Sequence, residues 1–319
     1  MVKFVEMPRR LPKATHVAVL MGGLSAEREV SKASGMAVHD ALRKIGYRQV
    51  TLMDVDHSIA AKLDDLRPDV AFNALHGRWG EDGRIQGILE YLQIPYTHSG
   101  VLASALAMDK QRSKALFQEA GIPVAESKVV SLEAAAAAHP MMPPYVVKPV
   151  AEGSSVGIHI VSSDDEAPVS QLLDEKDVHG GSVMVERFVP GRELTCAVMD
   201  DVALGVLEII PRGGFYDYDS KYSEGGSQHV CPADIPDRLT RKIQTYALKA
   251  HQALGCRGAT RADFRFDEKA GEEGELVILE VNTQPGLTPT SLLPDIARQA
   301  GHSFEELIMW MVDDASVNR

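Results

Sequence analysis

The stretch Val146–Gly157, VVKPVAEGSSVG, combines a lysine on an apolar run with a loop of glycine and serine residues. Lys148 ends the apolar run, where an ammonium group needs an anionic partner. Gly153 and the residues after it offer backbone N–H groups and hydroxyls that suit phosphate oxygens. In a P-loop the lysine follows the glycines, whereas Lys148 precedes Gly153 by five residues. The stretch therefore indicates a different nucleotide site. The alternatives are a solvated strand end for Lys148 and an ordinary turn for the glycine-serine loop.

Two strands expected near the C-terminus carry a second group of polar side chains. In ATRADFRF (259–266), the period of two puts Arg261 and Asp263 on the face opposite the phenylalanines. In ELVILEVN (275–282), Glu280 and Asn282 share a face, and a turn-rich link favours antiparallel pairing of the two strands. Carboxylate oxygens suit Mg²⁺, which completes its shell with phosphate and water. The alternative is a salt-bridged exposed sheet face, but asparagine within a strand is disfavoured without a reason.

Composition excludes several classes of protein. A chain of 319 residues is expected to form two or three domains. Its net charge of -12 argues against a nucleic-acid surface. No apolar run approaches the ~20 residues of a membrane span, and residues 1–16 lack the apolar core of a signal peptide, so we expect a flexible lead-in. The thiols Cys196, Cys231 and Cys256 have no metal-binding spacing and are expected to be idle in a reducing cytosol.

The first third of the chain alternates short apolar runs with amphipathic segments, which predicts a parallel α/β sheet. Ser25 is the expected N-cap of the first helix and Gly46 its end. The turn GGLSAE departs from the dinucleotide-binding motif. The strands are expected at 16–23, 50–56 and 69–77, and the helices at 25–45 and 84–93.

The rest of the chain predicts more strands and one long loop. The loop, residues 212–236, is rich in glycine and aromatic residues, and loops of this length are usually binding loops or lids. Helices are expected at 99–122 (with a break), in the alanine-rich segment before Pro140, at 167–175, at 237–254 and at the C-terminus. Strands are expected in YVVKP, GIHIVSS, SVMVERFV, ELTCAVMD and LGVLEIIP and in the two segments described above.

In this order, the motifs resemble the ATP-grasp superfamily and, within it, the D-alanine–D-alanine ligase family. The resemblance runs from GGLSAEREVS through ALHGRWGEDGRIQG, VVKPVAEGSSVG and FYDYDSKY to LEVNTQPGLTPTSLLP, nearly the whole chain. It implies an α/β protein with a Rossmann-like N-terminal domain (1–98), followed by two α+β ATP-grasp lobes (99–192 and 193–319). It also implies ATP-dependent ligation of two D-alanine molecules through a D-alanyl phosphate, for peptidoglycan synthesis in the bacterial cytoplasm. A homodimer is expected from the family.

The resemblance also assigns roles to individual residues. Glu27, which would otherwise only stabilise a helix N-terminus, is implied to hold the ammonium of the first D-alanine. Glu27, Ser154, Tyr222 and Arg261 are the implied catalytic residues, Arg261 at the acyl phosphate. Substrate binding is implied for Glu27, His76, Lys221, Tyr222, Arg261, Asn282, Gly286, Ser291 and Leu292. ATP binding is implied for Lys110, Lys148, Gly153, Ser154, Ser155, Val156, Glu186, Arg187, Phe188, Val189 and Glu193, and binding of two Mg²⁺ or Mn²⁺ ions for Asp263, Glu280 and Asn282.

Three residues depart from the family pattern, and two other functions stay open. Trp79 stands where a glycine is familiar, and Gln284 and Pro289 stand where serine is frequent. The first alternative is a ligase that joins D-alanine to D-lactate or D-serine, although the family links tyrosine at position 222 with dipeptide formation. The second is a catalytically silent nucleotide-binding protein, against which the intact acids and Arg261 argue.

Overall fold

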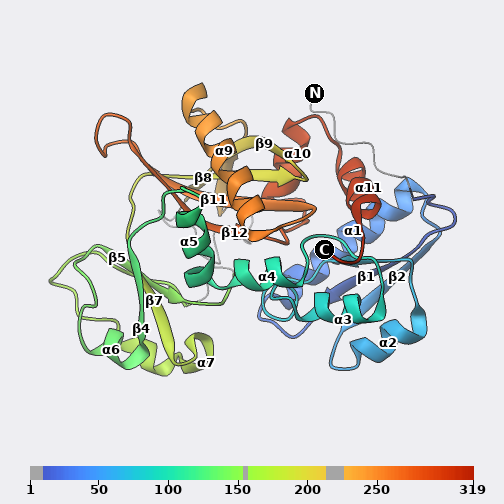
Figure 1. The fold of residues 1–319 in the computed structure, drawn as a ribbon, viewed down its shortest axis with the longest axis horizontal. Coiled ribbons are helices and arrows are strands. Elements are labelled where there is room, and N and C mark those ends of the chain that lie inside the picture. The colour runs from blue at the N-terminus through green and yellow to red at the C-terminus, as the bar shows by residue number, and fades with distance from the viewer. Residues whose placement is uncertain (1–9, 154–156, 213–225) are drawn as a thin grey trace.

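The computed structural model describes residues 10–153, 157–212 and 226–319, which form three β-sheets with helices packed around them (Figure 1). The first sheet has the order β2-β1-β3, the second β4-β7-β5-β6, and the third β10-β9-β8-β11-β12. In Figure 1 the central sheet lies at the lower left, the N-terminal sheet at the lower right and the C-terminal sheet above them. The predicted α/β class is confirmed, while the predicted domain limits remain a prediction.

The N-terminal sheet is parallel, as predicted. It consists of β1 (His16–Gly22), β2 (Gln49–Val55) and β3 (Val70–Asn73). Alternate residues of β1 face opposite sides: Val17 and Val19 join a cluster with α1 (Arg28–Ile45), whereas Ala18 and Leu20 pack with α2 (Ile59–Leu66) and α3 (Arg84–Leu92). Burial on both faces explains the continuous apolar run of β1.

The first helix begins later than predicted. Glu27 is its N-cap residue, so the expected cap at Ser25 is wrong. The Ser25 hydroxyl instead donates to the carbonyl of His76 at 2.7 Å and accepts from the Glu27 N–H at 3.2 Å. The predicted end is confirmed, because Gly46 adopts φ 110°, a left-handed conformation that favours glycine.

The central sheet is antiparallel and carries short helices. Its strands are β4 (Ser127–Ser131), β5 (Tyr145–Pro149), β6 (His159–Val161) and β7 (Ser182–Arg187). The strand β4 was not predicted, because SKVVS is a half-buried edge strand with little alternation. The helix predicted at 167–175 is wrong in its limits: a 3₁₀ turn covers Ser170–Asp174 and α7 covers Lys176–His179. The alanine-rich helix α6 is Leu132–Ala137.

The C-terminal sheet is antiparallel and is covered on both faces. Its strands are β8 (Arg192–Met199), β9 (Val202–Pro211), β10 (Ser227–Val230), β11 (Ala259–Asp267) and β12 (Glu275–Asn282). The helix α9 (Asp237–Leu254) packs on one face and α10 (Leu292–Gln299) on the other. The predicted long loop at 212–236 is therefore too long, because β10 pairs with β9 within it; residues 213–225 lie outside the described residues.

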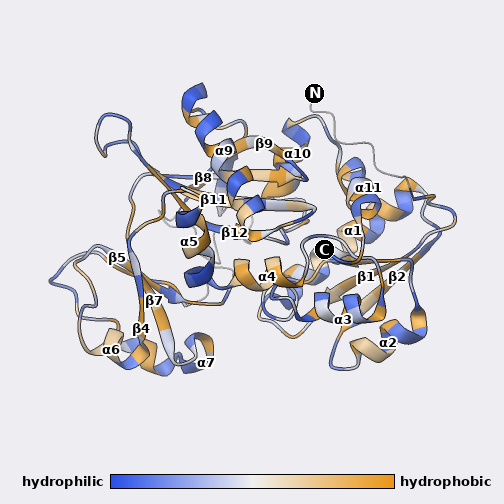
Figure 2. Cartoon of the chain, viewed as in Figure 1, coloured by the Kyte–Doolittle hydropathy of each residue, from blue (hydrophilic) through white to orange (hydrophobic). Residues whose placement is uncertain are grey.

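Two helices and one hydrophobic cluster join these sheets around the candidate site. The expected break in the 99–122 segment is confirmed at Asp109, between α4 (Val101–Met108) and α5 (Lys110–Glu119). The helix α4 is hydrophobic along nearly its whole length (Figure 2) and contacts α3, α9 and β12. One buried cluster also runs from α1 through α11 (Phe304–Asp314) to α10 and β9. These contacts set the N-terminal and C-terminal sheets against each other.

Two further expectations concern membranes and thiols. Within the described ranges, no helix has the length and apolar character needed to cross a membrane. All three cysteines are free thiols, and Cys196 and Cys256 are buried.

Candidate active site

An open pocket collects side chains from all three sheet-containing parts of the chain. Many of the residues assigned by sequence line this pocket together. They are Glu27, His76, Lys110, Gly153, Arg261, Glu280, Asn282, Gly286, Ser291 and Leu292. Ser154, Ser155, Val156, Lys221 and Tyr222 lie outside the described residues.

Glu27 lies at the start of α1 with its carboxylate against two glycines. A Cβ on Gly77 would collide with Glu27 Oε2, and a Cβ on Gly153 would lie 3.2 Å from the same oxygen. Glu27 is buried, with 7% of the residue exposed. Gly153, assigned to the ATP phosphates, and Glu27, assigned to the D-alanine ammonium, are therefore neighbours in space, although 126 positions separate them in the sequence.

His76 is held in a buried network beside Glu27. Its Nε2 is 3.0 Å from Ser34 Oγ and its Nδ1 is 3.3 Å from Glu81 Oε1. Burial lowers the pKa of His76, but the carboxylates of Glu81 and Glu27 outweigh burial and leave this pKa above its ordinary value. Burial, together with the charge of Glu27, also raises the pKa of Glu81. Sequence reasoning did not single out Glu81, although it lies within the motif ALHGRWGEDG.

Lys110 extends into the pocket from the first position of α5. Its Nζ donates to the carbonyl of Glu152 at 2.6 Å and lies 3.6 Å from Glu280 Oε2. Its backbone N–H donates to the carbonyl of Val150 at 2.9 Å. Lys110 thus ties the chain just before Gly153 to the acid at the end of β12. Glu152 was not predicted as a site residue, and burial raises the pKa of its carboxyl.

The predicted pairing of the two C-terminal strands is confirmed residue by residue. Arg261 lies opposite Asn282 and Asp263 opposite Glu280. Arg261 donates to Asp263 through Nε at 2.8 Å and through Nη2 at 2.7 Å, which fixes the plane of the guanidinium. Thr195 Oγ1 donates to the same carboxylate at 2.6 Å.

The acids and the amide of these strands fit a magnesium ion. A carboxylate has about four acceptor sites, and the three donors to Asp263 leave one for a cation. Glu280 faces the pocket with a third of its side chain exposed, and Asn282 Oδ1 accepts the N–H of Gln284 at 2.8 Å. Oxygen donors that leave room for phosphate and water are the surroundings that Mg²⁺ prefers.

Lys148 has the anionic partner that its position demanded. Its Nζ donates to Glu186 Oε1 at 2.5 Å, and Lys114 Nζ donates to Glu186 Oε2 and, at 2.8 Å, to the carbonyl of Ala125. All three charged side chains are at least nine-tenths buried. Burial raises the pKa of Glu186, but the two ammonium groups outweigh it and hold the pKa below its ordinary value. Sequence reasoning missed Lys114, because nothing in its own helix marks it as the partner of a strand residue.

The other residues assigned to the adenosine end surround the crossing from β7 to β8. Arg265 Nε donates to the carbonyl of Val189 at 3.0 Å, and its guanidinium carbon lies 5.7 Å from the centre of the Phe188 ring. Arg265 Nη1 is also 3.4 Å from Glu193 Oε2. Arg187 forms an ion pair with Glu275 of β12. The assigned residues thus join the central sheet to the C-terminal sheet.

Ser291 and Gly286 lie at the end of the pocket formed by the loop after β12. Ser291 precedes α10, and its Oγ accepts the N–H of Thr288 at 2.9 Å. A Cβ on Gly286 would lie 2.7 Å from Ser291 Oγ. Leu292 lines the pocket and also packs into the core.

Two of the three residues that depart from the family pattern have defined contacts in the structure. Trp79 adopts φ 73°, the left-handed region that favours glycine, and the Arg84 guanidinium stacks 4.6 Å from its ring centre. Gln284 is buried, accepts from Asn73 Nδ2 at 2.5 Å and donates to the carbonyl of Leu75. It therefore fastens the loop after β12 to β3.

Two family models match the sequence over most of its length. One, described as D-ala D-ala ligase N-terminus, matches residues 53–99, and the other, D-ala D-ala ligase C-terminus, matches residues 116–313. The chain is 62% identical over 308 residues to D-alanine–D-alanine ligase B of Mesorhizobium japonicum, covering 96% of this chain and all of the relative. It is 60% identical over 305 residues to D-alanine–D-alanine ligase B of Brucella melitensis, covering 95% and 96% of the two chains.

Solved structures agree with this similarity. The D-alanine–D-alanine ligase of Bacillus anthracis in complex with ATP superposes with a TM-score of 0.77 at 27% identity, covering 94% of this chain and 97% of the other. VanG D-Ala:D-Ser ligase of Enterococcus faecalis superposes with a TM-score of 0.74 at 30% identity, covering 93% and 98%.

Proposed function

The chain belongs to the D-alanine–D-alanine ligase family, and from this membership we propose that it joins two D-alanine molecules at the expense of ATP. The products are D-alanyl-D-alanine, ADP and phosphate. The observation that carries the proposal is the shared pocket, which places Glu27, Lys110, Arg261 and Glu280 around one space. This reaction needs an acid that holds an ammonium group, a lysine that binds phosphate, a guanidinium group and an acid that binds a metal ion.

The reaction has two steps, and each is balanced without another co-reactant. A carboxylate is a poor acyl donor, because oxide is a poor leaving group. In the first step, a carboxylate oxygen of D-alanine attacks the γ-phosphorus of ATP; the bond to the β-phosphate oxygen breaks and ADP leaves. In the second step, the neutral amine of another D-alanine attacks the acyl carbon, the C–N bond forms, and phosphate leaves as the nitrogen loses a proton.

We assign the first step to the lysines and to the acids of β11 and β12. Lys110 and Lys148 are the proposed contacts for the ATP phosphates, and residues 186–189 with Glu193 the proposed adenosine end. Asp263, Glu280 and Asn282 would hold Mg²⁺ or Mn²⁺, which supplies charge neutralisation on the transferred phosphoryl group. Lys110 lies 3.6 Å from Glu280, so its ammonium and a cation held by Glu280 would act on the phosphates at the same place.

We assign the second step to Arg261 and to the residues around Glu27. The ion pair with Asp263 holds the Arg261 guanidinium in one orientation, and a preorganised donor stabilises the negative charge that forms on the carbonyl oxygen when the amine attacks the acyl carbon. Glu27, buried beside Gly153, would hold the ammonium of the first D-alanine, with His76 and Glu81 behind it. Gly286 and Ser291 are the proposed contacts for the second D-alanine. The assigned Ser154, Lys221 and Tyr222 lie outside the described residues.

We also propose the setting in which the enzyme works. Its product is a building block for peptidoglycan, so we place the enzyme in the cytoplasm, where ATP is available, and expect a homodimer. Light scattering of the purified protein, with a mass near twice 34.7 kDa, would support the dimer, and a monomer mass would contradict it.

The function is tested by measuring phosphate release and the dipeptide with purified protein, ATP and Mg²⁺. We expect phosphate release that depends on D-alanine and equals the dipeptide formed. Parallel reactions that contain D-alanine with D-serine or D-lactate identify the preferred acceptor. No D-alanine-dependent phosphate release would overturn the proposal, and a preference for D-serine or D-lactate would replace the acceptor while keeping the first step.

A further inference from the structure

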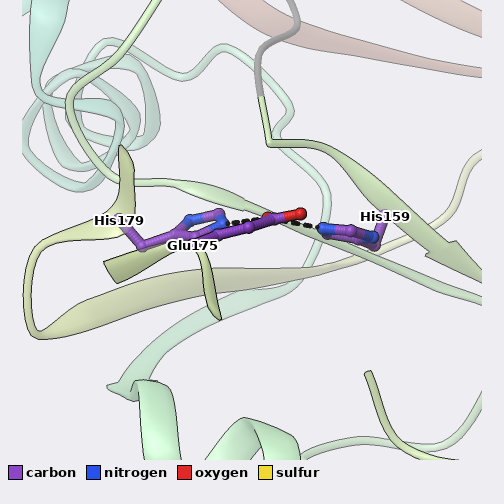
Figure 3. Close-up of side chains that lie close together, drawn as sticks. All are labelled: His159, Glu175 and His179. Carbon is purple, nitrogen blue, oxygen red and sulfur yellow. Dashed lines mark hydrogen bonds and ion pairs between the residues drawn. The ribbon is translucent and has the colours of Figure 1, made fainter. Parts of the chain in front are cut away.

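A second cluster of chemically active side chains lies in the central sheet, apart from the pocket. His159 begins β6, Glu175 immediately precedes α7, and His179 ends that helix. Figure 3 shows the two imidazole rings on either side of the Glu175 carboxylate. His159 Nε2 lies 2.9 Å and His179 Nε2 3.0 Å from the same oxygen, Oε2. None of the three residues lines the pocket described above.

Local structure explains why these side chains meet. Glu175 and His179 are four positions apart, so one helical turn places them on the same face. His159 pairs with Val147 of β5, which brings β6 beside this turn. Gly157, at φ 67°, makes room for the ring of His179, because a Cβ there would lie 2.9 Å from His179 Cε1.

The hydrogen bonds of the cluster involve the Nε2 atoms of both histidines and one oxygen of Glu175. The side chain of His179 is completely buried, and its Nδ1 has no hydrogen-bond partner among the described residues. An ionised carboxylate only accepts hydrogen bonds. Both imidazoles must then direct an N–H at one oxygen.

The three side chains are also the ligand set of a common type of zinc site. Two imidazole nitrogens and one carboxylate oxygen, with water in the fourth position, hold Zn²⁺ in many proteins. Bonds of about 2.0–2.1 Å in a tetrahedral site separate the ligand atoms by roughly 3.3 Å. The separations of 2.9 and 3.0 Å need only a small outward movement, and all three ligand atoms lie within 4.8 Å of one another. In the described part of the chain, no other three His, Cys, Asp or Glu side chains come this close.

We propose that His159, Glu175 and His179 bind a transition-metal dication, with Zn²⁺ as the preferred biological occupant. On binding, each imidazole changes tautomer: its proton moves from Nε2 to Nδ1, and Nε2 gives its lone pair to the metal in place of the N–H it now directs at Glu175. The site is distinct from the proposed magnesium site, because Mg²⁺ requires near-octahedral oxygen ligands and two imidazoles suit Zn²⁺. His159 keeps about a quarter of its side chain exposed, which gives an ion a path to the site.

The test is calorimetric titration of metal-stripped, full-length protein with Zn²⁺ in excess Mg²⁺, which occupies the carboxylate site of β11 and β12. We expect one Zn²⁺ per chain in the wild type and a loss of affinity of more than about tenfold in His159→Gln and His179→Gln. His57→Gln is the matched control, because His57 is exposed and lies outside the cluster. Co²⁺ gives a second readout, since tetrahedral coordination produces visible absorption that the same variants should lose.

Circular dichroism melting shows whether each variant is folded. If His179→Gln does not fold, His159→Gln decides the question, because His159 is partly exposed. The proposal is overturned if the wild type binds no Zn²⁺ in excess Mg²⁺, or if folded His159→Gln binds Zn²⁺ as tightly as the wild type and His57→Gln.

Discussion

Replacing Glu186 with glutamine should strongly destabilise the central part of the protein. The side chain is 4% exposed and accepts from two ammonium groups, those of Lys114 and Lys148. Glutamine has almost the same shape, so the change removes charge and leaves packing intact. Two buried ammonium groups then lack the carboxylate that both of them contact.

The magnitude follows from the burial of these charges. Removing one partner of a buried ion pair costs about 3–5 kcal/mol. The lysines can limit the cost by losing a proton: a lysine of ordinary pKa 10.5 is neutralised at pH 7 at a cost of about 5 kcal/mol, since each pKa unit corresponds to about 1.36 kcal/mol. We therefore expect Glu186→Gln to lower the free energy of unfolding by about 3–5 kcal/mol. With an unfolding entropy of about 2.1 cal/mol/K per residue, this loss corresponds to a decrease in melting temperature of about 4–7 °C for a chain of 319 residues.

The assay is thermal unfolding of the wild type, Glu186→Gln and Glu133→Gln without ligands. Glu133 is the matched control, because it lies in the same part of the chain and pairs with Lys176 at 3.6 Å on the surface. A surface ion pair contributes no more than about 1 kcal/mol, so the control should melt near the wild type. A melting temperature for Glu186→Gln as high as that of Glu133→Gln would refute the argument.

The pH dependence gives a second check with a defined sign. The folded pKa of Glu186 lies below the ordinary value of 4.5, so its stabilisation is complete above pH 4.5 and is lost as the pH falls through the folded pKa. The difference between the wild type and Glu186→Gln should be largest near neutral pH and should shrink in acid. A difference that grows below pH 4.5 would contradict this assignment.

Three further predictions test the site and the residues that depart from the family. Trp79→Gly should be more stable than Trp79→Ala by roughly 1 kcal/mol in thermal unfolding, because only glycine relieves the positive φ; equal stability would show that this backbone carries no strain. Gln284→Ala should cost about 2–4 kcal/mol, because one amide N–H of Asn73 and the buried carbonyl of Leu75 lose their hydrogen-bond partner. Exposed Gln111→Ala should change stability little, and equal melting temperatures of the two variants would contradict the bridging role. Glu280→Gln should keep the fold and lose most dipeptide formation at saturating Mg²⁺, and near-normal turnover would remove Glu280 from the metal site.

Much of the local structure follows from short-range patterns in the sequence. The continuous apolar run of β1 indicated a strand buried on both faces, and Gly46 marked the end of α1, since both depend on neighbouring residues along the chain. The period of two in β11 and β12 placed Arg261, Asp263 and Glu280 together, because pleating alternates side chains between the faces of a sheet. The assignment of roles within the pocket came from the resemblance to a family and is a proposal to be tested.

Tertiary structure alone decided which distant residues became partners. Lys114 and Glu186 are 72 positions apart, and Asn73 and Gln284 are 211 apart, yet each pair meets in the interior. No local pattern encodes such a pair, because a buried charge or amide only requires some partner, and the packing of helices and sheets selects which one. The same holds for β10, whose four residues become a strand only because β9 offers an edge to pair with. The cluster of His159 with Glu175 likewise arises because β6 and the turn before α7 are packed side by side.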